Sequence, residues 1–322
     1  MRYQLYKLLN FSVGLIPPFL LRHILRALHI RPQLGDRAGY HVFPHTFYNP
    51  FPDPTQVDVA RLKTKRDLPG VNLSVEKSLE LLRELSGFSA EVELFLKNRP
   101  GTARQLQLWN WTYPPCDSAA LYSMLRRLKP KRYIEVGCGY SSRASAAALK
   151  RNAEEGALCE ATYIEPYPPA HLAEMKLPGE FIQKRIEQVP LAVFQRLEAG
   201  DVLFIDTSHV IKVQNDVEYE LIHILPSLKA GVFVHVHDIL TPYDYPEDWL
   251  VGQSPNRGGN NEQYALECLL SGGGDWEVAL PVHLLWREHR SALKALVDSD
   301  ERPAAFWIKK IHRTGPFVEG AV

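Results

Sequence analysis

Short apolar runs rich in β-branched residues alternate with segments of helical spacing along the second two thirds of the chain. Runs of this kind, bounded by turns and separated by helices, are typical of a parallel sheet with both faces covered. The predicted strands lie at 132–136, 161–165, 181–186, 202–206, 231–236, 276–282 and 304–311. We therefore predict an α/β fold, a Rossmann-like and mostly parallel sheet with helices on both faces.

The first 110 residues follow a different pattern. Residues 74–98 place Leu and Val at helical spacing, with Ser74 or Asn72 as the expected cap. Residues 40–72 combine proline and aromatic residues without a period, which predicts an irregular but ordered segment whose aromatic side chains pack down. We predict a mainly helical appendage over 1–110, acting as a lid or in homodimerisation, and a main domain over 111–322.

The first thirty residues are apolar but interrupted. They contain Pro17 and Pro18 followed by Arg22, and the longest uncharged stretch, 8–21, is shorter than the ~20 residues of a membrane span. We expect no transmembrane segment here. The pattern favours a broken amphipathic helix that packs on the domain or on a second subunit, with peripheral membrane contact as the alternative.

Charge and cysteine content indicate which partners and which cellular compartment to expect. Thirty-seven basic and 37 acidic residues cancel, so no overall field attracts nucleic acid, and we expect no nucleic-acid partner. The four cysteines show no CxxC spacing, which predicts reduced thiols in a cytoplasmic protein.

Polar residues gather where the predicted strands end, the edge at which open α/β sheets bind ligands. The first strand runs into EVGCGYSS, where Gly137 and Gly139 permit a tight turn close to a ligand. Ser142 stands where a dinucleotide fingerprint has its third glycine, which argues against a pyrophosphate site. A plain structural turn is the alternative for this loop.

Three further strand ends carry charged groups. Glu165 ends the second strand, where a carboxylate can accept both hydroxyl protons of a ribose, as NAD or S-adenosylmethionine would require. The fourth and fifth strands end in FIDTSH and HVHD. An unpaired charge beside a core is costly, so such a grouping predicts a reaction centre or a metal cluster.

YIEVGCGYSS, YIEP, LFIDTSHV and GVFVHVHDI, in this order, resemble class I S-adenosylmethionine-dependent methyltransferases, and most closely the bacterial small-molecule subgroup that includes cephalosporin-hydroxylase-like proteins. The resemblance extends to NEQY at 261–264 and to the closing FWIKK run. It implies a seven-stranded sheet whose last strand is antiparallel and lies between the fifth and sixth. The cofactor site that it implies consists of Glu135, Gly137, Cys138, Gly139, Tyr140 and Ser141 beside the methionine part, Glu165 on the ribose, Glu187 or Gln188 by the adenine, and Asp206 near the sulfonium.

Metal-dependent members of this superfamily hold a divalent ion after the fourth and fifth strands. By resemblance the ligands here are Asp206, His237 and Asp238, with His283 as a later fourth ligand. Imidazole among the ligands favours iron, manganese or zinc over magnesium. The alternative is that His237 is a supporting donor and no metal binds. His235, inside its strand, is expected to be a core histidine.

The predicted activity is transfer of methyl from S-adenosylmethionine to a small-molecule acceptor, such as the hydroxyl of a sugar, a natural product or an acid, with possible metal assistance. His209 and Asp206 are the candidate catalytic residues, and His209 could serve as general base. A metal-dependent oxygenase or hydroxylase using the His/carboxylate site is the alternative. A NAD-linked oxidoreductase and a non-enzymatic scaffold fit the strand ends less well.

Overall fold

The structure is a computed structural model that describes residues 16–44, 46–49, 51–97, 112–250, 259–272 and 274–312. The chain divides into two compact units, Met1–Asp58 and Val59–Val322. The first unit contains α2 (Pro18–Ile30) and α3 (Pro32–Ala38). The second unit contains the sheet and every residue proposed above for chemistry.

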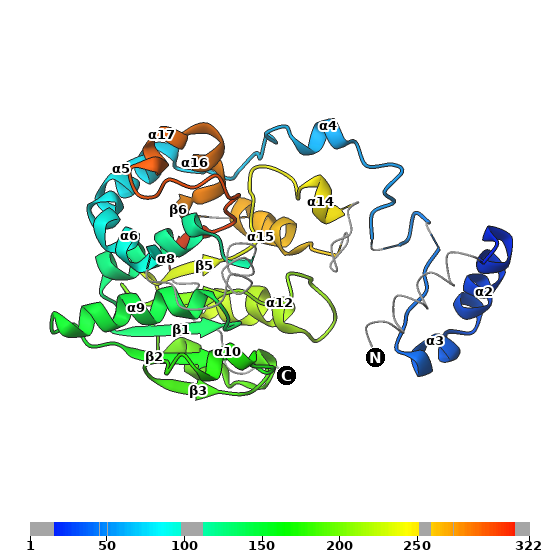
Figure 1. The fold of residues 1–322 in the computed structure, drawn as a ribbon, viewed down its shortest axis with the longest axis horizontal. Helices are drawn as coiled ribbons and strands as arrows, with labels where there is room; N and C mark the ends of the chain where they lie inside the picture. The colour runs from blue at the N-terminus through cyan, green and yellow to red at the C-terminus, as the bar shows by residue number, and fades with distance from the viewer. Residues whose placement is uncertain are drawn as a thin grey trace. The chain divides into compact units, whose positions relative to one another are not determined.

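A seven-stranded sheet forms the centre of the second unit, in the order β3-β2-β1-β4-β5-β7-β6 (Figure 1). The strands are β1 (Arg132–Val136), β2 (Glu160–Ile164), β3 (Glu180–Ile182), β4 (Val202–Ile205), β5 (Phe233–Val236), β6 (Trp276–Pro281) and β7 (Phe306–Lys310). The pairs among β1 to β5 are parallel, whereas β7 is antiparallel to both of its neighbours, β5 and β6. The predicted α/β fold and the antiparallel last strand are confirmed.

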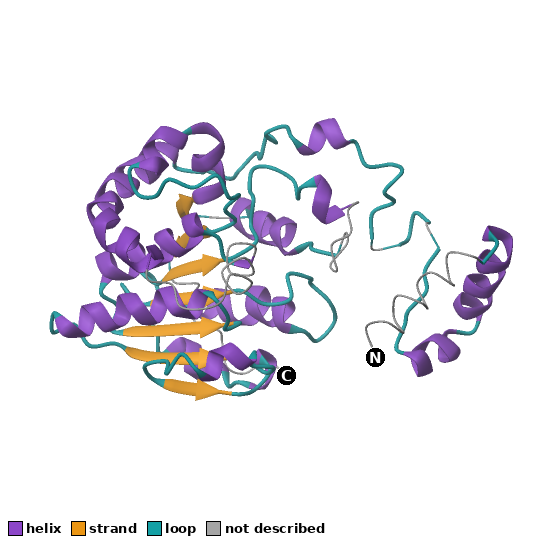
Figure 2. Cartoon of the chain, in the orientation of Figure 1, coloured by secondary structure: helices purple, strands orange, loops and turns teal. Residues whose placement is uncertain are grey.

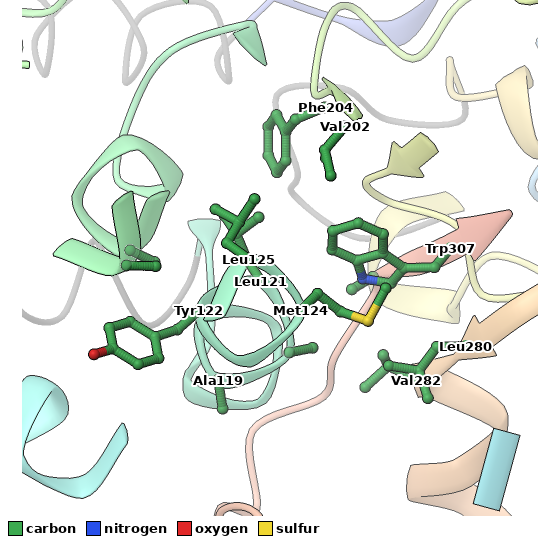
Figure 3. Packing of buried hydrophobic residues seen from close by; sticks show 14 of the residues in the cluster. Ala119, Leu121, Tyr122, Met124, Leu125, Val202, Phe204, Leu280, Val282 and Trp307 are labelled. Carbon is green, nitrogen blue, oxygen red and sulfur yellow. The ribbon is translucent and has the colours of Figure 1, made fainter. Parts of the chain in front are cut away.

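Successive side chains of a strand point to opposite faces, and this alternation builds two apolar cores. One face carries Phe204 and Trp307 against Leu121, Met124 and Leu125 of the helix α8 (Figure 3). The other core contains, among others, Leu203, Ile205, Val234, Val236 and Phe194. Because both faces are apolar, helices cover the sheet on both sides (Figure 2).

Helices supply the apolar side chains that cover the two faces of the sheet. The first core includes residues of α5 (Val75–Leu85), α6 (Ser89–Lys97), α8 (Pro115–Leu128) and α9 (Ser141–Glu154). The second includes residues of α11 (Leu191–Gln195), the π-helix η3 (Glu220–Ile224) and α15 (Glu262–Ser271). The other short helical elements are α4 (Val59–Leu62), η1 (Ser86–Phe88), α10 (Ala170–Ala173), η2 (Ile186–Gln188), α12 (Asp216–Tyr219), α13 (Leu225–Ser227), α14 (Glu247–Leu250), α16 (Val282–Glu288) and α17 (Arg290–Lys294).

The boundary expected at residue 110 differs from the structure. Leu82 and Leu85 of α5 and Val92 of α6 are buried in the first core, so these helices belong to the unit of the sheet. The division lies instead between Asp58 and Val59. An apolar helical stripe in the sequence shows that a helix must be covered, but it does not show by what. Residues 1–15, 45, 50 and 98–110 of the expected appendage lie outside the described residues.

Two local expectations are also corrected. Ser74 adopts a left-handed conformation (φ 48°) and makes no side-chain cap bond, and Asn72 Oδ1 instead accepts the Ser74 N–H at 2.9 Å. The aromatic side chains of the proline-rich segment do not pack down, since Phe47 is 96% exposed and Tyr48 90%. Within the described residues, no helix is long and apolar enough to cross a bilayer.

Candidate active site

The turn after β1 is locked to the neighbouring strand ends. Gly137 (φ 80°) donates its N–H to the Ile164 carbonyl oxygen at 3.0 Å, and the Asp206 N–H donates to Val136 at 2.9 Å. A Cβ at position 137 would lie 1.7 Å from the Asp206 carbonyl oxygen, so only glycine fits this crossing. A Cβ at Gly139 would meet nothing within 4 Å. The loop therefore borders open space at Gly139.

Glu135 does not face this open space. Its carboxylate is fully buried and accepts hydrogen bonds from Tyr133 Oη (2.8 Å) and from the hydroxyls of Ser141 (2.9 Å), Ser142 (2.7 Å) and Ser145 (2.6 Å). Burial raises the pKa of Glu135, although these four bonds oppose the rise. The predicted direct place beside methionine is thus corrected. Alternation along β1 turns Glu135 toward α9, where it fixes the first turn of the helix and so the shape of the loop.

The other loop side chains also turn largely toward the protein. Cys138 is buried, and burial, followed by the charge of Glu135, raises its thiol pKa well above the usual range. Ser141 is held by Glu135, and Tyr140 stacks on His171 with ring centroids 4.4 Å apart. The backbone around Gly139 is therefore the part of the loop that can approach a ligand closely.

Glu165 and Gln188 lie after β2 and β3. Glu165 is half-buried, and its Oε1 accepts the Tyr167 N–H at 2.6 Å, which orients the carboxylate. Burial raises the pKa of Glu165. Gln188 ends η2, with its N–H bound to the Arg185 carbonyl oxygen at 2.9 Å and its side chain exposed. Glu165 thus follows the carboxyl end of β2, which lies next to β1, and Gln188 follows that of β3, the neighbour of β2.

Four predicted residues meet where β4 and β5 end. His209 Nε2 lies 3.2 Å from Asp206 Oδ1 and 3.3 Å from Asp238 Oδ2. His237 Nδ1 lies 3.4 Å from Asp206 Oδ1 and 3.5 Å from Asp238 Oδ1. One nitrogen of each imidazole therefore faces the same two carboxylates.

Two further carboxylates hold the opposite nitrogens. His209 Nδ1 lies 3.0 Å from Glu262 Oε2, and His237 Nε2 lies 3.1 Å from Asp117 Oδ2. The His209 carbonyl oxygen accepts the N–H groups of Asn261 (3.0 Å) and Glu262 (3.2 Å), which ties the loop after β4 to the start of α15. Sequence reasoning missed Glu262 as a site residue, although NEQY contains it.

Asp117 lies inside the first turn of α8 and is fully buried. Its carboxylate accepts the N–H of Ala304 at 2.9 Å and of Ala305 at 3.0 Å in addition to contacting His237. Asp117 therefore joins α8, the approach to β7 and the end of β5. Its only sequence signal was an acidic residue near a helix start, which does not reveal these partners.

The site holds more acidic than basic groups. Burial lowers the pKa of His209 and His237, but the neighbouring carboxylates outweigh it and raise both values well above the usual range. Burial raises the pKa of Asp206, yet His237 and His209 bring it well below the usual range. Burial also raises the pKa of Asp238 and Glu262. Four carboxylates against two imidazoles suit a positively charged ligand.

Backbone strain accompanies this cluster. His209 (φ 58°) and Asp238 (φ 56°) both adopt the left-handed conformation that side chains other than glycine rarely take. Such conformations cost about 1–3 kcal/mol each and persist where surrounding contacts hold them. Here the strain turns both side chains toward the shared centre.

His283 does not reach the cluster. Its Nδ1 donates to the Pro303 carbonyl oxygen at 2.9 Å, and its ring lies between those of Tyr243 and Trp286. Burial lowers the pKa of His283 to about 4, so it is neutral. The predicted fourth metal ligand is corrected, because His283 belongs to α16 and packs away from the ends of β4 and β5.

His235 fits the expected core histidine. It is fully buried and stacks on Phe204 at 4.4 Å, and burial lowers its pKa well below the usual range. In the described ranges, no group of three or more His, Cys, Asp or Glu side chains is spaced to hold a metal ion as it stands. The imidazole nitrogens of the cluster contact carboxylate oxygens directly.

A family model described as a methyltransferase domain matches residues 134–239. That stretch runs from β1 to just beyond β5 and contains the glycine loop, Glu165 and the Asp/His cluster. Within residues 134–239 the chain therefore resembles a methyltransferase domain. The strand order, with β7 inserted between β5 and β6, is that expected for this fold.

Other proteins resemble longer parts of the chain. An uncharacterized protein of Archaeoglobus fulgidus is 26% identical over 193 residues, which cover 56% of this chain and 84% of that protein. The S-adenosylhomocysteine-bound plantazolicin methyltransferase BpumL is 15% identical, covers 73% of this chain and 97% of its own, and has a TM-score of 0.34. The TDP-rhamnose 3'-O-methyltransferase CalS11 is 13% identical, with coverages of 76% and 99% and a TM-score of 0.38.

The neutral state of His283 predicts a pH dependence of stability. Its folded-state pKa of about 4 lies below the ordinary 6.5, so between these values the unfolded chain binds a proton that the folded protein does not. His283 therefore contributes roughly 3 kcal/mol to the free energy of unfolding above pH 6.5, and this contribution is lost as the pH falls toward 4. His283→Gln should flatten this part of the free energy of unfolding in urea titrations. Equal pH dependence in both proteins would contradict the assignment.

Proposed function

We propose that this methyltransferase transfers the methyl group of S-adenosylmethionine to a hydroxyl of a small-molecule acceptor, such as a sugar, a natural product or an acid. The proposal rests on one observation. The glycine turn after β1 and the acidic cluster after β4 and β5 lie side by side at one edge of the sheet. The backbone hydrogen bond from Asp206 to Val136 places the acidic cluster beside the Gly137 turn. A sulfonium held near that turn would lie close to negative charge, which favours a cation.

The cofactor roles are assigned residue by residue. Glu165, oriented by the Tyr167 N–H, would accept the two ribose hydroxyls, and Gln188 would lie by the adenine. The open space at Gly139 would receive the methionine part, while Glu135 acts as a positioning residue through α9. Asp206 would face the sulfonium. These roles agree with the matched segment, which begins in β1 and includes all of them.

The transfer itself requires placement and removal of one proton. The acceptor oxygen forms a bond to the methyl carbon while the carbon–sulfur bond breaks, and the sulfur keeps the electron pair as S-adenosylhomocysteine leaves. The hydroxyl proton passes to the cluster, where the candidate base is the neutral form of His209, with Asp206 as its partner at 3.2 Å. Because the pKa of His209 is raised, this form is favoured at higher pH. Glu262 fixes the orientation of the imidazole from its other side.

We further propose that the cluster takes up a divalent cation, held by Asp206, His209, His237 and Asp238. Three features support this donor set. The nitrogen-to-oxygen distances of 3.2–3.5 Å are longer than those of strong charge-assisted bonds. Each imidazole has a carboxylate on its far nitrogen, as histidine ligands of metals commonly do. The donors also surround a region of excess negative charge.

Two imidazoles and two carboxylates suit iron, manganese or zinc better than magnesium. When bound, such an ion would lower the pKa of an acceptor hydroxyl. His209 thus takes the place that sequence reasoning gave to His283. The oxygenase alternative is not favoured, because the matched family is a methyltransferase.

A substitution at Glu165 tests the cofactor site. Glu165→Ala should remove two charge-assisted hydrogen bonds of ~1.5–3 kcal/mol each, lowering the affinity for S-adenosylmethionine at least tenfold in calorimetry. Glu160→Ala is the matched control, because Glu160 begins the same strand and lies on the surface beside Arg196. Unchanged affinity in Glu165→Ala would remove this residue from the ribose site.

Metal content and turnover test the cation site. Protein equilibrated with Fe(II), Mn(II) or Zn(II) should retain metal in elemental analysis, and His209→Ala and His237→Ala should each lose it. His283→Gln is the matched control and should retain it, because that residue contacts Pro303 instead. Affinity for S-adenosylmethionine should persist in every variant, since Glu165 and the Gly137 turn are unaltered.

Turnover is measured as S-adenosylhomocysteine release over an acceptor library, with and without each metal. Full activity in chelated wild-type protein would contradict metal assistance and leave His209 as a metal-independent base. Metal loss in His283→Gln, with retention in His209→Ala, would instead restore the ligand set expected from sequence. No release with any acceptor by a protein that binds the cofactor would count against methyl transfer itself.

A further inference from the structure

Helix α2 in the first unit is amphipathic and has no buried residue. At 100° per residue most of its apolar side chains form one continuous face, consisting of Leu20, Leu21, Ile24, Leu25, Ala27 and Leu28. The opposite face carries Arg22, His23, Arg26 and His29, together with Phe19 and Ile30 at the two ends of the helix. On the apolar face Leu20, Ile24 and Leu25 are 45%, 44% and 42% exposed. Within the described residues of its own unit, much of this hydrophobic face stays exposed.

Exposed aromatic side chains follow this helix in the same unit. They are Tyr40 (71% exposed), Phe43 (53%), Phe47 (96%), Tyr48 (90%) and Phe51 (44%). Single exposed apolar residues are common on proteins, but this density within twelve positions is not. Aromatic rings of this kind are enriched at the level of lipid headgroups, where an apolar ring body and a polar surrounding are both satisfied.

The charged side chains of residues 1–35 are all basic. Residues 1–35 include Arg2, Lys7, Arg22, Arg26 and Arg31 and contain no Asp or Glu. The whole chain is neutral, so this stretch concentrates basic charge that is balanced elsewhere. Basic groups beside an apolar helical face attract anionic lipid headgroups, at about 1 kcal/mol for each Lys or Arg near the surface.

We propose that the unit Met1–Asp58 binds the surface of an anionic lipid bilayer, with α2 lying in the interface. Its leucine and isoleucine side chains enter the boundary of the acyl chains, its arginines contact lipid phosphates, and the aromatic segment lies at headgroup depth. The helix lies on the bilayer and does not cross it, because α2 has only 13 residues.

A second copy of the chain fits this face less well. A two-fold dimer brings the same patch of both copies together. Pairing the apolar faces of two α2 helices would cover those faces but leave Arg22 and Arg26 on the outer sides, and residues 1–35 offer no carboxylate to offset them. An anionic bilayer supplies the missing negative charge and covers the apolar face at once. The charge pattern therefore selects lipid over the homodimer expected from sequence.

Co-sedimentation of the full chain with vesicles tests the proposal. Vesicles of phosphatidylcholine mixed with phosphatidylglycerol should bring the protein into the pellet, vesicles of phosphatidylcholine alone much less, and high salt should release it. The double variant Leu20→Ser with Ile24→Ser should weaken binding about tenfold or more by removing buried apolar groups. Arg22→Gln with Arg26→Gln should weaken binding to the anionic vesicles about tenfold.

The matched control is Leu158→Ser with Val213→Ser, which alters two apolar side chains that are 79% and 90% exposed in the second unit. It should bind vesicles like the wild type. Circular dichroism and S-adenosylmethionine binding verify that all variants fold. Three outcomes would overturn the proposal: no pelleting with either vesicle, equal pelleting with both, or a solution dimer without vesicle binding that Leu20→Ser with Ile24→Ser dissociates.

Discussion

Buried negative charge at the ends of β4 and β5 is the constraint around which the methyltransferase domain is arranged. Asp117, Asp206, Asp238 and Glu262 surround His209 and His237, and an uncompensated buried charge costs several kcal/mol. Each carboxylate is therefore tied to a different part of the fold. Asp117 links α8 to the start of β7, and Glu262 links α15 to the loop after β4. Packing of the helices and assembly of the site thus depend on the same contacts.

The loop after β1, which is proposed to bind the cofactor, is subject to a steric constraint. The crossing of Gly137 over the Asp206 carbonyl leaves no room for a side chain, and Glu135 fixes the helix that follows through four hydroxyl bonds. The glycine loop and the acidic cluster are consequently one rigid edge and not two loops. A cofactor bound by the loop would have its sulfonium presented to negative charge without rearrangement of the strands.

The strands and the polar residues that end them were predictable, because β-branched runs and turns leave a local trace in the sequence. The partners of those residues were not. Asp117 and His237 are separated by 120 positions, and Glu262 and His209 by 53, so their contacts arise only when the sheet is wound. Glu135 and His283 were misplaced for a related reason. Local spacing identifies a polar residue near a strand end but does not fix the face toward which its side chain turns.

Calorimetric titration of the purified protein with S-adenosylmethionine and, separately, with NAD tests the central claim most directly. Both ligands carry a ribose that Glu165 could hold. Only S-adenosylmethionine carries a sulfonium for the acidic cluster and needs no third glycine, whose position Ser142 occupies here. The account predicts saturable binding of S-adenosylmethionine and none of NAD under the same conditions. Binding of NAD without binding of S-adenosylmethionine would contradict it.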